Sequence, residues 1–430
     1  MQSHTTKVEY PIRAQLGDQS RACGYELYDD IAASRAATWL TWTRITMTIQ
    51  ANGERAGDCI CWIKLRLVTL PLRTAVSDAK VLTGRQKPLE SVSLLFAEIQ
   101  TSQGHSGLGF TYSLRTGGPA QYAHAQEIAP LLLGEDPNDI ARLWSKLIWA
   151  SASVGRGGVA AQAIAAIDTA LWDLKARRAA LPLSKLLGAH RSAVPCYNTS
   201  GGYLQASIEE VLDKATQSRE RGIGGIKMKV GQPSRRLDLQ RVEALRMHLG
   251  DEVPLMVDVN QQWDRITALR MGRELEQYHL EWIEEPLDAH DVAGHAALAA
   301  QLDTPIGTGE MLTSATEALG YVDTGAVDVI MHDAPRLGGI TPFLKVAHAA
   351  EQRGMIMAPH FVMEIHLHLA AAYEHQTWVE HFEWLEPAFN ERLEIRDGQM
   401  IVPDRPGLGL SLSDQIADWT QAQVEFGKRA

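Results

Sequence analysis

From about residue 191 onward, short apolar runs alternate with longer segments whose apolar residues recur at helical spacing. Amphipathic stretches such as RLDLQRVEALRMHLG and PFLKVAHAAEQRG separate the runs. Strands alternating with helices in this way predict a closed parallel barrel. A doubly wound open sheet is the alternative, but no Gly-rich phosphate-binding motif follows the first strand. The eight runs are VPCYNTS, GIKMKV, PLMVDVN, EWIEEP, PIGTGE, VDVIMHDA, MIMAPH and TWVEHF.

The region before residue 191 has a different order of predicted elements. The segments WIKLRLVTLPL and SVSLLFAEIQTSQGHSGLGFTYS predict strands that meet at polar, Gly-rich turns. Three helical patterns follow, of which the last, AAQAIAAIDTALWDLKARRA, is Ala-rich, as expected of a tightly packed helix. This order predicts an α+β domain ahead of the barrel.

Composition and charge limit the classes of function. The chain has 430 residues, of which 45% are hydrophobic and 22% charged, as in ordinary globular proteins. Its net charge of −11 argues against a nucleic-acid-binding surface and against attraction to anionic membranes. We find no apolar run long enough to span a bilayer, and the four cysteines form no CxxC pair. We therefore expect a cytoplasmic enzyme whose substrate, if anionic, binds in a local basic pocket.

Nearly every predicted barrel strand ends in a polar or ionisable residue. From Lys229 to His360 these residues recur at intervals of 23 to 29 positions, which is about one strand–helix unit. The carboxyl ends of barrel strands converge at the mouth, where active sites of this architecture lie. The residues at these ends are Lys229, Asp258, Glu284, Glu310, Asp333, His360 and Glu380.

Three of these residues, Asp258, Glu284 and Glu310, are carboxylates on successive predicted strands. Like charges placed side by side are unfavourable without a counter-ion. A hard divalent cation resolves the repulsion, and Mg²⁺ suits three carboxylates together with water and substrate. Each acid alone could instead cap the following helix or pair with a surface arginine. The even spacing of all three favours the metal.

Lys227 and Lys229 interrupt an apolar strand at alternate positions, so both side chains point to the same face. Two like charges are costly on a buried strand, which predicts that they face a site. We expect Lys227 to lower the pKa of Lys229 and to pair with a substrate carboxylate. The alternative is that Lys227 reaches solvent along the strand.

Lys229 and His360 lie on the second and seventh predicted strands and would approach the mouth from opposite sides. Two acid/base groups on opposite faces of one carbon require this placement. A lone histidine on a strand is usually structural. Asp333, at the end of the preceding strand, favours a catalytic role, because a carboxylate can hold one ring nitrogen and raise imidazole basicity.

Together these residues resemble the enolase superfamily, and within it the mandelate racemase subgroup. The matching segments are KMK, DVNQ, WIEEP, GTGE, WVE and the pair Asp333 and His360. Longer segments such as VSDAKVLTGRQKPL, DVNQQWDR, IEEPLDAHD and HFEWLEP resemble acid-sugar dehydratases of that subgroup. The resemblance runs from about residue 60 to the C-terminus.

The resemblance implies a (β/α)7β modified TIM barrel with an α+β capping domain at the N-terminus. The cap would occupy residues 57–190 and the barrel residues 191–400, and residues 401–430 would pack back on the cap. Residues 1–56 form an N-terminal extension without a match, and we assign them no role.

The resemblance also implies residue roles. Mg²⁺ would bind Asp258, Glu284 and Glu310. Lys229 and His360 would be the acid/base groups. The other implied residues are Asp333 as partner of His360, Lys227 on the substrate carboxylate, and Asp78, Ala79, Lys80, Arg115, Asn260, His360 and Glu380 as substrate contacts.

Two positions depart from the family pattern. Leu114 replaces a lysine before Arg115 and removes one cation near the distal carboxylate of the substrate, which bears on the diacid preferred. His332 replaces a proline beside Asp333, whose following APR and GG remain. We do not expect the second change to affect the chemistry.

The predicted function is Mg²⁺-dependent removal of the proton α to a carboxylate, followed by loss of the β-hydroxyl to give a 2-keto-3-deoxy diacid. Epimerisation of the substrate is a second outcome of the same site. Another dehydratase or a racemase of the subgroup is the nearest alternative. A non-catalytic metal- and sugar-acid-binding protein would lack an acid/base residue, and none is missing. We also expect a homo-oligomer.

Overall fold

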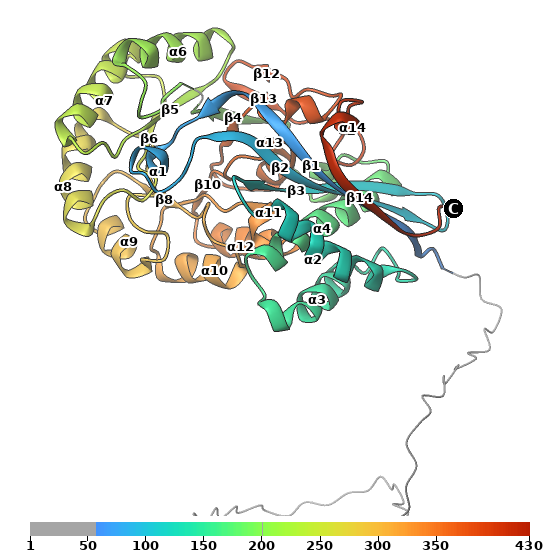
Figure 1. The fold of residues 1–430 in the computed structure, drawn as a ribbon. Coiled ribbons are helices and arrows are strands. Elements are labelled where there is room, and N and C mark those ends of the chain that lie inside the picture. Colours follow the sequence, from blue (N-terminus) through green and yellow to red (C-terminus); the bar gives the residue numbers. More distant parts are fainter. Residues whose placement is uncertain (1–56, 200) are drawn as a thin grey trace, which may run out of the picture. The chain divides into compact units, whose positions relative to one another are not determined.

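The computed structural model describes residues 57–199 and 201–430 and contains two sheets (Figure 1). The predicted N-terminal extension, residues 1–56, lies outside the described residues. Within the described part of the chain, no helix combines the length and apolar character needed to cross a membrane.

The larger sheet contains eight parallel strands that form a closed barrel. Neighbours pair in sequence order from β4 to β10, and β11 pairs with β4. A parallel bridge between Met357 and Thr377 joins β10 to the segment just before β11. Closure confirms the predicted barrel over the open sheet. The strands are β4 (Ala193–Asn198), β5 (Gly225–Lys229), β6 (Leu255–Asp258), β7 (Ile283–Glu284), β8 (Ile306–Thr308), β9 (Val329–Ile330), β10 (Ile356–Met357) and β11 (Val379–His381).

Seven principal helices connect these strands, one in each interval, so the barrel is of the predicted (β/α)7β type (Figure 1). Side-chain caps fix where several of them begin. Ser207 and Glu210 form a capping box, and Asp264 accepts the backbone N–H of Thr267. The helices are α6 (Ile208–Glu220), α7 (Arg235–Leu249), α8 (Arg265–Leu275), α9 (Val292–Ala299), α10 (Ala315–Thr324), α12 (Ile340–Glu351) and α13 (Met363–Ala372), with the one-turn α11 (Ala334–Leu337) before α12.

The smaller sheet belongs to the cap and is antiparallel, in the order β14-β1-β2-β3. Its last strand in sequence, β14, comes from the C-terminus and pairs with β1, with Trp62 opposite Gly427. The C-terminal segment was predicted to pack on the cap, but the strand it forms there was not predicted. The elements of this region are β1 (Ile60–Val76), α1 (Ala79–Leu82), β2 (Leu89–Thr101), β3 (Ser106–Leu114), α2 (Gly118–Ile128), α3 (Ile140–Ala150), α4 (Val159–Arg178) and β14 (Thr420–Gly427).

The Ala-rich helix α4 packs directly on β3. A Cβ atom added at Gly109 would lie 2.2 Å from the carbonyl oxygen of Ala166, and one at Gly107 would lie 2.2 Å from that of Ala170. Both glycines are therefore required by the close approach of strand and helix. This contact fixes β3, whose far end carries residues that reach the barrel mouth.

The same helix also contacts the barrel. Asp168 on α4 accepts hydrogen bonds from the backbone N–H and the hydroxyl of Thr341, at 2.9 and 2.6 Å, at the start of α12. Trp144 on α3 donates its indole N–H to the carbonyl oxygen of Gly338 at 2.9 Å. These bonds hold the cap helices against the segment that follows β9.

Short elements complete the described chain. The hairpin β12–β13 extends the barrel sheet beside β4, where Met400 pairs with Val194. The short elements are α5 (Leu183–Leu186), β12 (Ile395–Arg396), β13 (Gln399–Ile401), α14 (Ile416–Trp419) and the 3-10 helices η1 (Ala129–Leu132), η2 (Ala152–Val154), η3 (Glu276–Tyr278) and η4 (Glu386–Ala388).

Candidate active site

The predicted ionisable residues all lie at the carboxyl ends of the barrel strands, at one mouth. Lys229, Asp258 and Glu284 are the last residues of β5, β6 and β7, and Glu380 lies within β11. The other three, Glu310, Asp333 and His360, follow β8, β9 and β10 by two or three residues.

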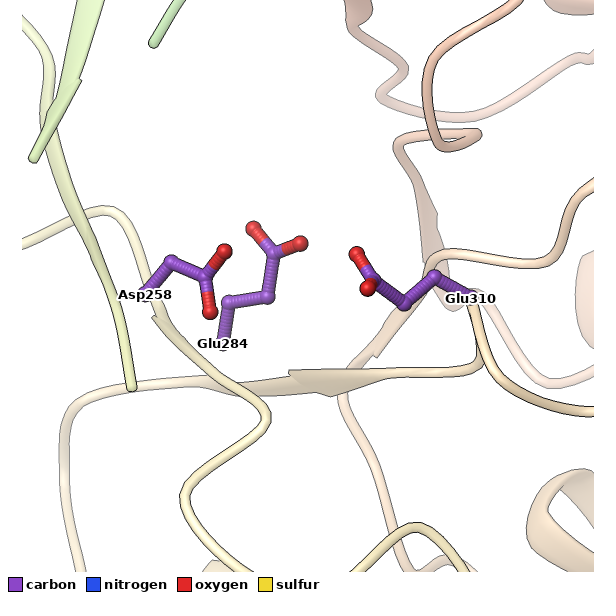
Figure 2. Close-up of side chains that lie close together, drawn as sticks. All are labelled: Asp258, Glu284 and Glu310. Atoms are coloured by element: carbon purple, nitrogen blue, oxygen red, sulfur yellow. The ribbon is translucent and has the colours of Figure 1, made fainter. Parts of the chain in front are cut away.

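Three carboxylates, Asp258, Glu284 and Glu310, point toward one another (Figure 2). One oxygen atom from each lies within 4.8 Å of the others, and all three residues are buried. Among the described residues, Oε1 of Glu284 has no hydrogen-bond partner. A buried carboxylate oxygen without a donor is costly unless a cation binds it. The three residues therefore fit an oxygen-preferring divalent cation.

Lys227 is enclosed by carboxylates at this mouth. Its ammonium nitrogen lies 2.6 Å from Oε2 of Glu284 and 2.8 Å from Oε1 of Glu380. The nitrogen also lies 5.1 Å from the centre of the Tyr197 ring. Burial lowers the pKa of Lys227, but Glu284 and Glu380 raise it more, so the lysine stays protonated. With 1% of its side chain exposed, Lys227 does not reach solvent.

Lys229 donates a hydrogen bond to Oδ2 of Asp258. Burial lowers the pKa of Lys229, the Asp258 carboxylate raises it, and Lys227 lowers it again, with a net pKa above the ordinary value. Lys227 lowers the pKa of Lys229 as predicted, but the expected net shift toward a usable base is wrong, because the pKa ends above its ordinary value. Asp258 outweighs the neighbouring lysine because it contacts Lys229 directly.

His360 and Asp333 form the predicted pair. Nδ1 of His360 lies 3.0 Å from Oδ2 of Asp333, and Nε2 lies 3.5 Å from Oε2 of Glu310. Burial raises the pKa of Asp333, but the hydrogen bond with His360 and the charges of neighbouring residues together lower it below its ordinary value, so the carboxyl group is ionised. Because Nδ1 faces a carboxylate, it carries the ring proton in the neutral histidine. Nε2 is then the atom able to accept or return a proton at the mouth.

Residues of the cap and the barrel line one cavity at this mouth. From the cap, Asp78 accepts the backbone N–H groups of Lys80 and Val81 and so begins α1. The guanidinium group of Arg115 lies 3.1 Å from Oδ2 of Asp78. The lining residues include Asp78, Lys80, Leu114, Arg115, Tyr203, Lys227, Lys229, Asn260, Glu310, Arg336, His360 and Glu380.

One predicted contact, Ala79, is fully buried and does not line the cavity. Its neighbour Lys80 does, with its nitrogen 3.9 Å from the sulfur of Met311. Asn260 donates its backbone and side-chain N–H groups to Asp258, at 2.8 and 3.2 Å. Its Oδ1 has no partner among the described residues. The substituted residue His332 is buried and absent from the lining.

Three residues at or next to the mouth were not predicted from the sequence, namely Tyr112, Arg336 and Tyr203. Tyr112 comes from β3 of the cap, and its hydroxyl oxygen lies 2.6 Å from Oδ2 of Asp333. Arg336 follows Asp333 in α11 and lines the cavity. Tyr203, in the loop after β4, lines it too, and burial raises its pKa to about 12. The Gly-rich loop before Tyr203 was the one local signal. Tyr112 occupies an ordinary position in an alternating strand.

Two family models match the chain. The mandelate racemase/muconate lactonizing enzyme N-terminal domain matches residues 81–188, and the enolase C-terminal domain-like model matches residues 210–416. A relative 62% identical over 388 residues is the L-talarate/galactarate dehydratase of Salmonella typhimurium strain LT2. That match covers 90% of this chain and 98% of the relative. The chain belongs to the enolase superfamily.

This enolase-superfamily chain is also 36% identical over 353 residues to the 3,6-anhydro-alpha-L-galactonate cycloisomerase of Streptomyces coelicolor. The match covers 81% of this chain and 96% of that protein. The family predicted from the motifs at the strand ends is thereby confirmed.

Solved structures of the superfamily share the fold. The crystal structure of L-talarate dehydratase from Polaromonas sp. JS666, complexed with Mg and L-glucarate, matches with a TM-score of 0.86 at 63% identity. It covers 87% of this chain and 100% of that chain. A racemase from Streptomyces coelicolor with bound magnesium matches with a TM-score of 0.80 at 34% identity, over 84% and 99% of the two chains. The predicted barrel with a capping domain is confirmed.

Proposed function

We propose that this protein is a Mg²⁺-dependent acid-sugar dehydratase of the L-talarate/galactarate type. The observation that carries the proposal is the convergence of a three-carboxylate cluster with Lys229 and the His360–Asp333 pair at one barrel mouth. The 62% identity to a dehydratase of that name supports the substrate class.

Asp258, Glu284 and Glu310 would hold Mg²⁺ through one carboxylate oxygen each. The ion, when bound there, supplies positive charge that makes the proton α to a carboxylate more acidic and stabilises the resulting enediolate. Lys227 adds a fixed positive charge beside Glu284 and Glu380. Because it is buried and protonated, it does not compete for the proton.

Lys229 or His360 removes the α-proton, according to the configuration of the substrate. Lys229 must be neutral for this, which requires that Asp258, whose carboxylate raises the pKa of Lys229, be paired with the cation instead. Nε2 of His360 must carry its lone pair. The electron pair of the broken C–H bond passes into the enediolate. Asp333 stabilises the imidazolium ion that forms when His360 is the base.

Loss of the β-hydroxyl completes the reaction. The enediolate collapses, the carboxylate re-forms, and a double bond develops between the α and β carbons. The C–O bond at the β carbon breaks as His360 gives its proton to the departing oxygen, which leaves as water. The product enol tautomerises to the 2-keto-3-deoxy diacid. When Lys229 is the base, His360 must hold a proton beforehand.

Epimerisation uses the same groups. A proton removed from one face of the α carbon by one base can be replaced on the opposite face by the other. The positions of Lys229 on β5 and of His360 after β10 support this second outcome. Dehydration and epimerisation then differ only in whether the hydroxyl leaves before reprotonation.

The cap would bind the end of the substrate distant from the metal. Lys80 and Arg115 line the cavity and offer positive charge to a second carboxylate. Arg115 is already paired with Asp78, which leaves it fewer free N–H donors. Leu114 also lines the cavity, so this chain presents an apolar side chain where a cation is expected. We propose that the distal carboxylate is held mainly by Lys80 and Arg115.

The direct test is a screen of acid sugars for 2-keto product in the presence of Mg²⁺. We expect product from L-talarate and galactarate, and loss of the activity on chelation that added Mg²⁺ restores. Epimerised substrate without keto product would identify a racemase. Binding without either product would identify a non-catalytic protein and contradict the proposal.

We further propose that the enzyme acts in the cytoplasm as a homo-oligomer, without nucleic-acid or membrane partners. The net charge of −11 supports the absence of nucleic-acid and anionic-membrane partners. Sedimentation of the purified protein tests the oligomeric state, and a monomer at working concentration would contradict it.

A further inference from the structure

Tyr112, on strand β3 of the cap, contacts the His360–Asp333 pair on the side away from the substrate cavity. The hydroxyl oxygen of Tyr112 lies 2.6 Å from Oδ2 of Asp333, 3.3 Å from Nδ1 of His360 and 3.3 Å from Nε of Arg336. Tyr112 and Asp333 are buried, and neither lines the substrate cavity. Tyr112 therefore acts on the reaction only through its neighbours.

The directions of the hydrogen bonds among Arg336, Tyr112 and Asp333 follow from which of their groups can only donate. Arg336 can only donate, so the tyrosine oxygen accepts from its Nε and the single hydroxyl hydrogen is free for Asp333. Burial raises the pKa of Tyr112 well above its ordinary value, so that hydrogen is retained. The chain of donation runs from Arg336 through Tyr112 to Asp333.

This chain restricts both Asp333 and His360. Oδ1 of Asp333 accepts the backbone N–H of Arg336 at 3.1 Å, and Oδ2 accepts from Tyr112 and His360. Because the Tyr112 hydrogen is directed to Asp333, it is not available to Nδ1 of His360. Nδ1 must then donate to Asp333, which leaves the lone pair of Nε2 facing the cavity.

The contacts of β3 within the cap and the packing on Phe361 fix the position of Tyr112. Its ring meets Phe361, the residue after His360, edge to face at 4.9 Å between ring centres. Its carbonyl oxygen accepts a hydrogen bond from Gln121 of α2 at 3.1 Å. Strand β3 is itself held by α4, which is bonded to α12 of the barrel through Asp168.

We propose that Tyr112 is a positioning residue through which the cap orients the His360–Asp333 pair and fixes the proton-transfer atom of His360. The inference rests on the proposed function, since it concerns one of that function's two bases. No described contact links Tyr112 to Lys229. The effect on α-proton exchange is therefore selective for the face of the substrate that His360 addresses, whereas dehydration slows for both epimers because His360 protonates the departing hydroxyl.

The test is Tyr112→Phe, which removes the hydroxyl and keeps the ring against Phe361. Tyr373→Phe is the matched control, because its buried hydroxyl donates to a backbone carbonyl, that of Met355, at 2.7 Å. In heavy water, NMR follows exchange of the α-proton in one epimer whose proton faces His360 and in one whose proton faces Lys229. Steady-state kinetics of dehydration are measured on the same samples.

We expect Tyr112→Phe to slow His360-side exchange and to lower kcat by about tenfold or more, as for loss of a hydrogen bond to a charged group. Lys229-side exchange and KM should stay within about twofold of wild type, because substrate binding and the other base are unaffected. Tyr373→Phe should change none of these quantities. An equal loss on both faces, or no loss on either, would overturn the proposal.

Failure of the proposed function would give a different result, namely wild-type protein that neither dehydrates nor exchanges any acid sugar. Tyr112 is then tested with ¹⁵N-histidine-labelled protein, in which the His360 signals are those missing from His360→Asn. We expect wild type to show the Nδ1–H form and Tyr112→Phe to show a shift away from it. Identical His360 signals in both proteins would overturn the positioning role.

Discussion

The ammonium nitrogen of Lys227 lies 2.6 Å from Oε2 of Glu284, with 1% of each side chain exposed. This ion pair joins strand β5 to the cluster formed by Asp258, Glu284 and Glu310. Glu380 contacts the same nitrogen from the other side, so one buried cation is shared by two buried carboxylates. Such an arrangement is costly unless every charge is compensated. It makes Lys227 both a structural counter-charge and a source of positive potential at the mouth.

Lys227→Met should impair proton removal by both bases to the same extent. The fixed charge stabilises the shared enediolate and does not select a face, so we expect each exchange rate to fall by about 100-fold or more. The variant should also unfold at lower temperature, because two carboxylates lose their partner. Lys214→Met, on the outer helix α6, is the control. Loss of exchange on one face only would contradict this account.

Glu284→Gln should retain the fold and lose Mg²⁺ affinity together with turnover. The substitution keeps the shape of the side chain at the mouth while removing the charge of one of three clustered carboxylates. Calorimetric titration with Mg²⁺ and circular dichroism measure the two properties, with the exposed Glu274→Gln as control. Full Mg²⁺-dependent activity in Glu284→Gln would remove the metal assignment.

Leu114→Lys should lower KM for a six-carbon diacid more than for the corresponding monoacid. Leu114 lines the cavity next to Arg115, so a lysine there adds charge near the distal carboxylate. Leu82→Lys is the control, because Leu82 is 48% exposed on α1 of the same cap. Equal changes in KM for both substrates would mean that position 114 does not face the distal end.

Glu364→Gln should stabilise the protein increasingly as the pH rises. Burial raises the pKa of Glu364 from 4.5 to about 8, so the folded protein holds this carboxyl group neutral where the unfolded chain ionises it. Wild-type stability is therefore lost as the pH rises from 4.5 to about 8, by about 1.4 kcal/mol per pH unit from this group. Glutamine does not titrate.

The difference in melting temperature between Glu364→Gln and wild type should grow between pH 5 and pH 8, measured with Mg²⁺ at the same concentration throughout. Glu243→Gln, at an exposed position of α7, should show no such trend. A difference that is constant over this range would mean that Glu364 is ionised in the folded protein.

The barrel and its mouth were predictable because they are specified by short apolar runs and by ionisable residues that recur at regular spacing along the chain. Each of the eight strands is a short apolar run, and an ionisable residue lies near the carboxyl end of seven of them, β5 to β11, at intervals of 20 to 29 positions. The carboxylates of β6, β7 and the segment after β8 could thus be placed together before any coordinates. The pairing of His360 with Asp333 followed from the same rule, since the two strands are neighbours.

Features that depend on distant segments were not predictable in this way. The contact of Tyr112 with Asp333 joins residues 221 positions apart on different domains, and nothing in the strand around Tyr112 indicates it. Strand β14, TQAQVEFG, alternates polar residues with Ala422, Val424 and Phe426, but its partner β1 lies at the other end of the described chain, so their pairing is not local. The pKa of Lys229 depends on its hydrogen bond to Asp258, which sequence spacing does not specify.

The central claim is that two bases address opposite faces of one carbon, and face-resolved exchange of the α-proton in heavy water tests it most directly. His360→Asn should abolish dehydration yet retain exchange for the epimer whose proton faces Lys229. Lys229→Met should suppress that exchange and spare the epimer whose proton faces His360. If His360→Asn, folded and binding Mg²⁺ normally, lost exchange with every epimer, the two-base account would be wrong and Lys229 would have only a binding role.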